Sequence, residues 1–332
     1  MPKKEIILVT GAAGFIGSHL VDVLVAKGYR VRCFVRKKDN LEFLPNKNIE
    51  IFYGDITDKR SILPAIKGVD IVYHLAAKTD FAGKNWNEYY RPNVLGTQNL
   101  IDLAVKEKVR SFIFFSTIRV IGLRDCKQPV NELAVYNPLN FYDRSKYEAE
   151  KKLFEAYHEL KLPITIIRPT SVYGPRDRGT YYSFFKAIAA GKFFLIGSGK
   201  NLVSFVNVKN VVEAAILAKD SLKAVGQVYF INDDRAYTMK EFSSQIARAF
   251  GKQLPRLRLP IVSAYVVSYF LSGCARVLGF KPILTPERVK NLTLNYVFDI
   301  KKAKRDLGYK PKIGLVEGVQ ETAQWYKKHD WI

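Results

Sequence analysis

The stretch EIILVTGAAGFIG, residues 5–17, joins a short apolar run to a turn that contains three glycines. The apolar run predicts a buried strand, and the pattern of residues 15–27 predicts a helix. Glycines permit a tight turn, and the amides and positive dipole of a helix N-terminus suit a pyrophosphate. The position of the turn between strand and helix favours a dinucleotide site over a plain connecting turn. The residues expected to contact the dinucleotide there are Gly11, Gly14, Phe15, Ile16 and Gly17.

Further apolar runs alternate with helical patterns along the first half of the chain. Strands are expected at residues 30–35, 49–53, 69–74, 110–115 and 163–168, and the clearest helices at 85–106 and 142–160. Near-continuous apolar strands separated by helices indicate a parallel sheet that is covered on both faces. We therefore predict an α/β fold, a Rossmann doubly wound parallel sheet whose ligands bind at the carboxyl ends of the strands.

This alternation loosens beyond about residue 172, where Tyr173-Gly174-Pro175 signals a turn. We expect residues 1–172 to form the dinucleotide-binding Rossmann domain and residues 173–332 to form a smaller, mixed C-terminal substrate lobe. Residues 200–232, with strands near 203–206 and at 227–231, are expected to cross back to the first domain.

Composition places the chain among globular proteins, with 332 residues of which 48% are hydrophobic and 25% charged. The three cysteines, Cys33, Cys126 and Cys274, are scattered, so neither a disulfide framework nor a metal site is expected. They fit a reducing compartment. Residues 1–5 run straight into the first strand and leave no room for a signal peptide, which predicts a cytoplasmic location.

The net charge of +22 favours polyanionic partners such as nucleic acid, an anionic membrane surface or phosphorylated ligands. Lysine and arginine are spread along the chain, and no nucleic-acid-binding motif accompanies them, so no specific nucleic acid partner is expected. Peripheral contact with an anionic membrane and a generally basic surface both stay open as interpretations.

The end of the second strand reports which dinucleotide binds, because an acidic residue there would hold a ribose hydroxyl and repel a 2′-phosphate. Arg36 occupies this position, followed by Lys37 and Lys38, while Asp39 comes too late in the sequence to take the acidic place. Arg36 and Lys37 are the residues expected to contact the cofactor there. Basic groups suit the 2′-phosphate of NADP(H), which is therefore favoured, with NAD(H) as the alternative. Further cofactor contacts are expected from Asp55, Ile56, Leu75, Ala76 and Ala77, which follow the third and fourth strands.

Tyr142 and Lys146 form the pattern Y-x-x-x-K at the start of a helix, and this spacing places phenol and ammonium on one face. A free phenol has a pKa near 10, too high for efficient acid–base work at neutral pH. An adjacent ammonium and the positive nicotinamide ring would lower that value. Ser116 and Thr117 end the fifth strand, where a hydroxyl can hold a reacting oxygen toward Tyr142.

The ordered set TGAAGFIGSHL, YGDITD, HLAA, NVLGTQNLIDLA, FFST, YDRSK and RPTSVYGP resembles the extended short-chain dehydrogenase/reductase family. The C-terminal stretch FDIKKAKRDLGYKPKIGLVEGVQETAQWY is similar to that family's closing segment. The resemblance implies that Tyr142 and Lys146 are catalytic, with the catalytic hydroxyl at Thr117 and Ser116 beside it. It also implies that Tyr142, Lys146, Pro169 and Ser171 contact the cofactor and that Asn93 helps to order the active-site helix. A homodimer, with an interface built from the helices at 85–106 and 142–160, is implied as well.

The resemblance leaves two activities open. The segment VRCFVR is similar to the dihydroflavonol-reductase-like branch, and GSGKNLVSFVNVKNVVEA to the hydroxysteroid-dehydrogenase branch. These favour an oxidoreductase that interconverts a secondary alcohol and a ketone on a small apolar molecule. The alternative is a nucleotide-sugar epimerase or dehydratase, although Ile118 follows the hydroxyl where many dehydratases have an acid. A non-catalytic NADP sensor would not need the Tyr142 and Lys146 pair.

Residues 259–275 contain no charged side chain. The run is slightly short for a membrane span. It predicts a helix that covers the cleft or forms a dimer surface, with two alternatives: a wall for a lipid-like substrate, or an interfacial helix drawn to anionic lipid.

Overall fold

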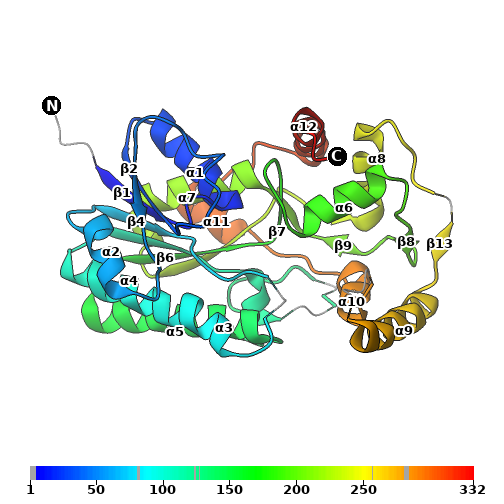
Figure 1. Ribbon diagram of the computed structural model, residues 1–332, viewed down its shortest axis with the longest axis horizontal. Helices are drawn as coiled ribbons and strands as arrows, with labels where there is room; N and C mark the ends of the chain where they lie inside the picture. Colours follow the sequence, from blue (N-terminus) through cyan, green and yellow to red (C-terminus); the bar gives the residue numbers. More distant parts are fainter. Residues whose placement is uncertain (1–4, 81–82, 123–124, 127, 256, 280–283) are drawn as a thin grey trace.

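The first strand, β1 (Ile6–Thr10), lies inside a seven-stranded parallel sheet of the computed structural model, which describes residues 5–332 except 81–82, 123–124, 127, 256 and 280–283 (Figure 1). The strand order is β11-β6-β5-β4-β1-β2-β3. The chain builds outward from β1 in one direction and then from β4 in the other, so the switch point lies between β1 and β4. The other strands are β2 (Arg30–Val35), β3 (Ile49–Tyr53), β4 (Ile71–His74), β5 (Ser111–Phe115), β6 (Ile164–Pro169) and β11 (Gln227–Ile231). The predicted Rossmann fold is confirmed.

Residues 1–4, on which the expectation about the N-terminus depends in part, lie outside the described residues.

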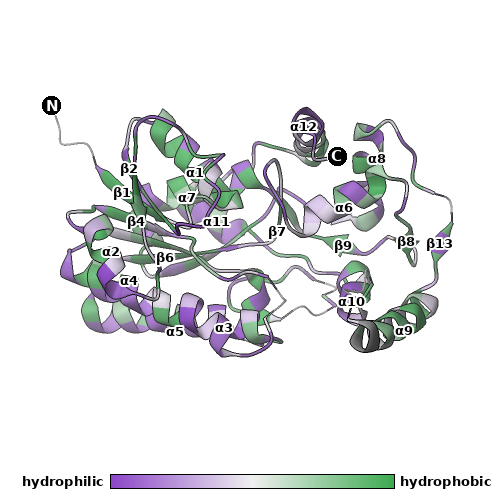
Figure 2. Cartoon of the chain, viewed as in Figure 1, coloured by the Kyte–Doolittle hydropathy of each residue, from purple (hydrophilic) through white to green (hydrophobic). Residues whose placement is uncertain are grey.

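Helices cover both faces of this sheet, as the alternation of buried side chains requires (Figure 2). Ile7 and Val9 of β1 belong to one buried cluster, whereas Ile6 and Leu8 belong to the other, because successive side chains of a strand point to opposite faces. The helices of this domain are α1 (Phe15–Ala26), α2 (Lys59–Ile66), α3 (Asn87–Tyr89), α4 (Gly96–Lys106), α5 (Phe141–Leu160), α7 (Val208–Asp220) and α11 (Lys301–Leu307), with 3-10 turns at Ile118–Ile121 and Leu222–Ala224.

The single helix predicted over residues 85–106 is wrong in one respect. A π-helical turn, Tyr90–Leu95, separates α3 from α4. Pro92 lies in this turn, and a proline has no backbone N–H and clashes with the preceding turn of an α-helix. The wider turn accommodates the proline and also contains Asn93, which is buried.

The remaining helices gather at the other end of the molecule around three two-stranded sheets (Figure 1). The predicted strand near residues 203–206 does not join the main sheet: Leu202–Val203 pairs with Tyr237–Thr238, and Phe205–Asn207 pairs with Ser171–Tyr173. Instead, β11 returns to the main sheet beside β6. The elements are β7 (Ser171–Tyr173), α6 (Thr180–Ala189), β8 (Leu195–Ile196), β9 (Leu202–Val203), β10 (Phe205–Asn207), β12 (Tyr237–Thr238), α8 (Met239–Ala249), β13 (Arg258–Leu259), α9 (Ile261–Leu278), α10 (Pro286–Thr293) and α12 (Leu315–Lys328).

Among the described residues, we find no helix with the length and apolar character needed to cross a membrane.

The turn after β1 depends on the absence of a side chain at Gly17. A Cβ atom built on this residue would lie 2.2 Å from the carbonyl oxygen of Gly11 and 3.0 Å from its carbonyl carbon. Both atoms belong to the backbone of the same turn, so neither can swing away. The first turn of α1 therefore packs directly on the backbone that leaves β1.

We expect Gly17→Ala to lower the free energy of unfolding by about 1–3 kcal/mol, because the added methyl group must displace backbone. Urea denaturation followed by circular dichroism measures this change. The matched control is Gly273→Ala in α9, where nothing lies within 4 Å of the added Cβ. There we expect a gain of about 0.5–1 kcal/mol, since alanine loses less backbone entropy in a helix. Equal effects of the two substitutions would contradict this account of the turn.

Candidate active site

The glycine turn opens into a cleft of about 1180 Å³ at the carboxyl ends of β1 and β4. Gly11 has a φ of +68°, and a Cβ atom there would lie 2.8 Å from the backbone nitrogen of Ala76. Gly14 is the N-terminal cap of α1 and uses no side chain to satisfy the helix amides. The amides at the start of α1 are thus available to an anionic ligand, and the small residues after β4 let it lie against the backbone.

Most of the predicted cofactor and catalytic residues line this one cleft. Lys37 and Ser171 are not among the lining residues, and their neighbours Lys38 and Thr170 are. The predicted residues that do line it are Gly11, Gly14, Phe15, Ile16, Gly17, Arg36, Asp55, Ile56, Leu75, Ala76, Ala77, Ser116, Thr117, Tyr142, Lys146 and Pro169. The segment Arg176–Gly179 also lines the cleft. From the sequence, Arg176 follows a strand and could face either substrate or solvent, whereas no local pattern marks the three residues after it.

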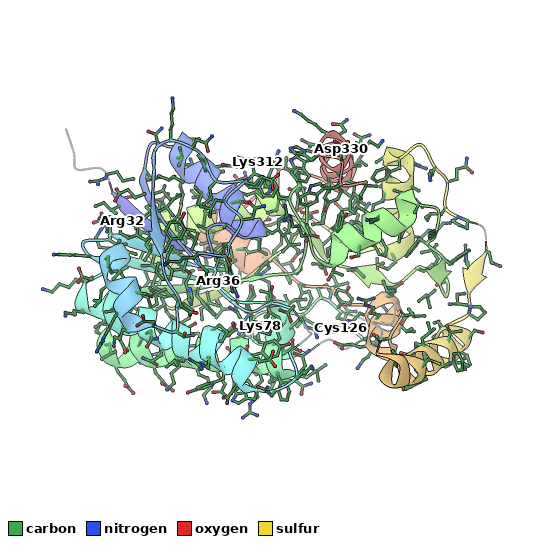
Figure 3. All side chains as sticks on the ribbon, in the orientation of Figure 1. Arg32, Arg36, Lys78, Cys126, Lys312 and Asp330 are labelled. Carbon is green, nitrogen blue, oxygen red and sulfur yellow. The ribbon has the colours of Figure 1, made fainter. Side chains whose placement is uncertain are left out.

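Arg36, which Figure 3 labels, directly follows β2 and lines the cleft. It is paired with a carboxylate. Its Nε and Nη2 atoms donate to Asp39 Oδ1 at 3.0 and 2.8 Å, and its backbone N–H donates to Asp39 Oδ2 at 2.8 Å. Although Asp39 comes three residues after Arg36 in the sequence, the turn after β2 brings its carboxylate back to the guanidinium. A cation and an anion therefore share the position that selects between cofactors.

Asp55 stands on the wall of the cleft as an ionised acceptor. Its Oδ1 atom accepts hydrogen bonds from the backbone N–H and the hydroxyl of Thr57, each at 2.8 Å. The backbone N–H of Thr57 is the main cause that lowers the pKa of Asp55, with Arg36 and Arg91 adding to it. A carboxylate held in this way suits a ligand that donates hydrogen bonds.

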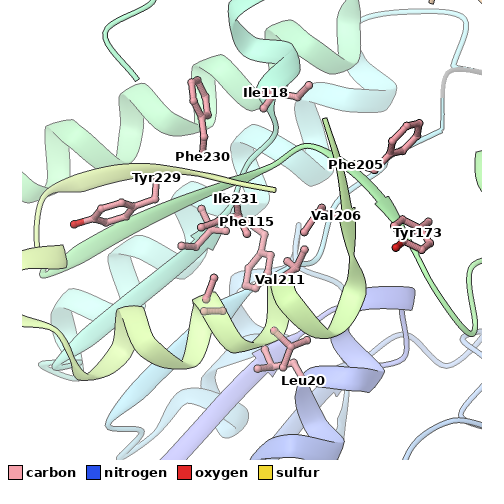
Figure 4. Packing of buried hydrophobic residues seen from close by; sticks show 14 of the residues in the cluster. Leu20, Phe115, Ile118, Tyr173, Phe205, Val206, Val211, Tyr229, Phe230 and Ile231 are labelled. Carbon is pink, nitrogen blue, oxygen red and sulfur yellow. The ribbon is translucent and has the colours of Figure 1, made fainter. Parts of the chain in front are cut away.

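The catalytic candidates come from β5 and α5. The side chains of Phe115 and Ile118 pack into the buried core on either side of Ser116 and Thr117, which fixes the end of β5 (Figure 4). On α5, Lys146 lies one turn after Tyr142 and is buried, with its Nζ atom 3.9 Å from the centre of the Phe114 ring. Thr117 and Tyr142 both line the cleft, and the Thr117 hydroxyl acts to lower the pKa of the Tyr142 phenol.

Burial opposes charge on both of these groups. Desolvation raises the pKa of Tyr142 to about 12, with Asp143 acting in the same direction and Arg119 and Thr117 against it. Desolvation also lowers the pKa of Lys146 to about 7, opposed by Glu150. The sequence led us to expect that the Lys146 ammonium lowers the pKa of Tyr142. In this structure Arg119 and Thr117 lower it instead, because burial removes much of the charge from Lys146 near neutral pH.

Arg119 is a further residue of this site, for which the sequence left contact with substrate and exposure to solvent equally open. Its Nε atom lies 2.7 Å from Oδ1 of the buried Asp143, directly after Tyr142, and its Nη2 atom lies 3.2 Å from Glu287 Oε1 in α10. The guanidinium thus connects the start of α5 to the second lobe. Its charge also favours the ionised form of Tyr142.

Asn93 anchors the other side of the catalytic helix. Its Nδ2 atom donates to Ser145 Oγ at 2.8 Å and to the carbonyl of Lys78 at 3.0 Å, while its Oδ1 atom accepts from the backbone N–H of Lys78 at 2.7 Å. Ser145 lies directly before Lys146 on α5. The π-helical turn therefore places Asn93 where its side chain contacts both the loop after β4 and the helix α5.

A tyrosine and a lysine one helical turn apart, facing a glycine turn across one cleft, are the arrangement of the extended short-chain dehydrogenase/reductases. The chain is an NAD(P)-dependent enzyme of this class. Within the class it belongs to the 3-beta hydroxysteroid dehydrogenase/isomerase family, whose pattern its residues 8–261 match.

Relatives of this chain include both dehydrogenases and epimerases. It is 31% identical to the decarboxylating sterol-4-alpha-carboxylate 3-dehydrogenase of Mus musculus, over 97% of this chain and 91% of the mouse protein. It is 30% identical to the N-acetyl-alpha-D-glucosaminyl-diphospho-ditrans,octacis-undecaprenol 4-epimerase of Escherichia coli O157:H7, over 97% and 96% of the two chains. Among solved structures, the UDP-glucose 4-epimerase of Thermotoga maritima with UDP-glucose superposes with a TM-score of 0.80 at 27% identity, over 98% and 99% of the two chains.

We expect the burial of Lys146 to make stability depend on pH. Between a pH of about 7 and about 10.5 the unfolded lysine holds a proton that the folded one lacks, so the free energy of unfolding rises with pH over this range. Lys146→Met removes this dependence and should stabilise the protein at pH 7 by up to ~5 kcal/mol, with the difference shrinking as the pH increases. Urea denaturation over this pH range measures the change.

The control is Lys151→Met, on the same helix but exposed and paired with Glu148. An exposed pair of this kind contributes about 0–1 kcal/mol, so its curve should run parallel to that of the unmodified protein. A parallel curve for Lys146→Met as well would show that the buried lysine does not titrate in this range.

Proposed function

We propose that this protein is an NADP(H)-dependent oxidoreductase that interconverts a secondary alcohol and a ketone on a small, mostly apolar molecule. The observation that carries the proposal is that Thr117, Tyr142 and Lys146 meet on a cleft that the glycine turn also lines. One side of the cleft thus suits a dinucleotide, and the other holds a group that can exchange a proton with a substrate oxygen.

The residues of the cleft fit a nicotinamide dinucleotide. A Cβ at Gly11 or Gly17 would fill the cradle at the start of α1. Ser116 Oγ, on the same cleft, is buried and has no hydrogen-bond partner among the described residues. When bound, the nicotinamide would accept hydride from the carbinol carbon, or return it to a carbonyl carbon.

The protein's own groups would then handle the proton. Thr117 would hold the substrate oxygen by a hydrogen bond while the phenol oxygen of Tyr142 accepts the hydroxyl proton as the ketone forms, or returns it in the reverse direction. A phenol whose pKa is raised to about 12 is a weak base, so a positive charge nearby must favour the phenolate during oxidation. Arg119 and the oxidised nicotinamide ring would supply that charge.

The names of the relatives support an apolar substrate. The mouse relative is named for a sterol carboxylate and the Escherichia coli relative for a sugar linked through a diphosphate to undecaprenol. A sterol and a polyprenol both carry a large apolar part. Ile118 follows Thr117 and is buried, so this position supplies no carboxylate for dehydratase chemistry.

A 4-epimerase is the second candidate, because the undecaprenol-linked relative and the UDP-glucose structure are both epimerases. The two reactions differ in their cofactor balance: an oxidoreductase leaves one reduced nicotinamide for each alcohol oxidised, whereas an epimerase returns the cofactor unchanged. Incubation with 3β-hydroxysteroids and, separately, with UDP-glucose distinguishes them by the absorbance of reduced nicotinamide. Conversion of UDP-glucose to UDP-galactose without net reduction would place the epimerase first.

Tyr142→Phe should lower kcat by about 10²- to 10⁴-fold, the usual contribution of a positioned acid or base. The affinity for NADPH should change little, since the phenol oxygen faces the substrate. Steady-state kinetics and NADPH fluorescence titration on the same preparation separate the two effects. Unchanged kcat would remove Tyr142 from the mechanism.

For the cofactor, we expect Arg36→Ala to weaken NADPH binding by about tenfold or more and to leave NADH binding nearly unchanged, because only NADPH carries the 2′-phosphate. Asp39→Asn should do the opposite and tighten NADPH binding, since it frees Arg36 from its carboxylate partner. Lys37→Ala is the control, as Lys37 is not among the residues that line the cleft. NADH that binds more tightly than NADPH, together with an NADPH affinity that neither variant alters, would overturn the assignment of NADP(H).

A further inference from the structure

The loop that carries Arg36 packs against the second lobe. This loop, residues 36–48, is described throughout and connects β2 to β3 without a helix or strand of its own. Its residues Arg36, Lys38, Asp39, Asn40 and Phe43 line the cleft. A surface connection of this kind is mobile unless other parts of the protein hold it. The contacts that the loop makes therefore decide how firmly its cleft-lining residues are placed.

Phe43 joins this loop to the second lobe. Its ring centre lies 5.5 Å from that of Trp325 in α12 and 6.1 Å from that of Trp331. The guanidinium carbons of Arg176 and Arg178 lie 5.4 and 5.6 Å from the same Phe43 ring centre. Two aromatic rings and two cations of the second lobe thus contact one side chain of the loop.

Arg178 connects the loop to Trp331 through three contacts. Besides its position over the Phe43 ring, its Nη2 atom lies 3.2 Å from Glu42 Oε2. Its guanidinium carbon lies 4.6 Å from the Trp331 ring centre. At exposed sites each cation–π contact or ion pair contributes little by itself. The loop is therefore held by the combination of these contacts on one guanidinium.

The second lobe fixes the segment that carries Arg178. The carboxylate of the buried residue Asp177 accepts a hydrogen bond from the backbone N–H of Tyr182 in α6 at 3.2 Å. The Tyr326 hydroxyl donates to the Asp177 carbonyl at 3.0 Å, and the Tyr182 hydroxyl donates to the Trp331 carbonyl at 3.0 Å. Because these hydrogen bonds lie within the second lobe, that lobe is the fixed side of the contact, and the loop is the side that it positions.

We propose that Arg178 and Trp331 are positioning residues for the cofactor: they hold the loop so that Arg36 can reach the 2′-phosphate of NADP(H). The inference rests on the proposed function, because it concerns how the cleft prefers this cofactor. It gives the second lobe a role in cofactor selection, in addition to its expected role in binding the substrate. Since both residues act through Arg36, NADPH binding depends on them, whereas binding of NADH, which lacks the phosphate, does not.

Arg178→Ala and Trp331→Ala should each weaken NADPH binding by about three- to tenfold and NADH binding by less than about twofold. Fluorescence titration with each cofactor measures both affinities. Trp331→Phe keeps an aromatic ring beside Arg178 and should restore NADPH binding. A general loss of stability would weaken the two cofactors equally, so the ratio of the two affinities separates positioning from a merely structural role.

The matched control is Arg235→Ala. Arg235 also belongs to the second lobe, and 59% of its side chain is exposed, against 55% for Arg178. It likewise combines an ion pair with a ring contact, since its Nη2 atom lies 3.1 Å from Glu241 Oε1 and its guanidinium carbon 4.1 Å from the Tyr237 ring centre. Arg235 is not among the described residues that line the cleft, so this variant should bind both cofactors like the unmodified protein.

A double-mutant cycle tests whether Arg178 acts through Arg36. In the Arg36→Ala background the 2′-phosphate has already lost this partner, so adding Arg178→Ala should change NADPH binding by less than about twofold. If the fold-changes of the two single variants multiply instead, Arg178 contacts the phosphate independently of Arg36, and the proposal is wrong.

Two further results would overturn the proposal. One is equal weakening of NADPH and NADH binding by Arg178→Ala, and the other is NADPH binding that Trp331→Ala leaves unchanged. Both are read in a protein that binds NADPH more tightly than NADH before any substitution. The reverse preference in the unmodified protein would instead count against the proposed function on which this inference rests.

Discussion

The structure depends on a contact between two stretches of backbone: the turn after β1 lies against the end of β4, with Gly11 so near Ala76 that no side chain fits between them. This contact sets the switch point of the sheet, since β1 and β4 are neighbours and the chain builds outward from each in opposite directions. The cleft forms at that point because the connections to either side diverge. The positions of the remaining site residues follow from the order of the strands that carry them.

Buried polar groups, rather than surface ion pairs, hold the catalytic helix in place. His74 at the end of β4 contacts Thr10 at 2.7 Å and Thr97 at 2.9 Å, and burial lowers its pKa to about 3, so it acts as a neutral link. The hydroxyl of Thr97 donates to the carbonyl of Asn93, whose side chain reaches Ser145 on α5. Farther along the same helix, buried Glu150 pairs with buried Arg168 of β6. A buried polar group that lost its partner would cost free energy. The network therefore favours the one arrangement of the helix in which these groups stay paired.

The same burial that positions the catalytic groups makes their charged forms unfavourable in the free protein. It raises the pKa of Tyr142 and lowers the pKa of Lys146, so both ionised forms cost free energy until charge is supplied. Arg119 reduces this cost for Tyr142, and its second contact, Glu287, belongs to the second lobe. The electrostatics of the catalytic tyrosine are therefore coupled to the second lobe, which we expect to bind the substrate. A stable fold does not require a buried tyrosine whose pKa depends on nearby charge. An acid–base group that responds to a bound cation does require one.

The sequence by itself determined the strand–turn–helix unit, the parallel sheet and the Tyr142 and Lys146 pair, because each is a local pattern: a period, a glycine spacing or a one-turn separation. Tertiary structure alone decided where the helix over residues 85–106 breaks, how Asp39 returns to Arg36, and that Arg119 meets Glu287, 168 residues away. It also decided the protonation of Lys146. These features depend on burial and on contacts between distant segments, and the free energy of a charge is set by its surroundings in space rather than by its neighbours in sequence.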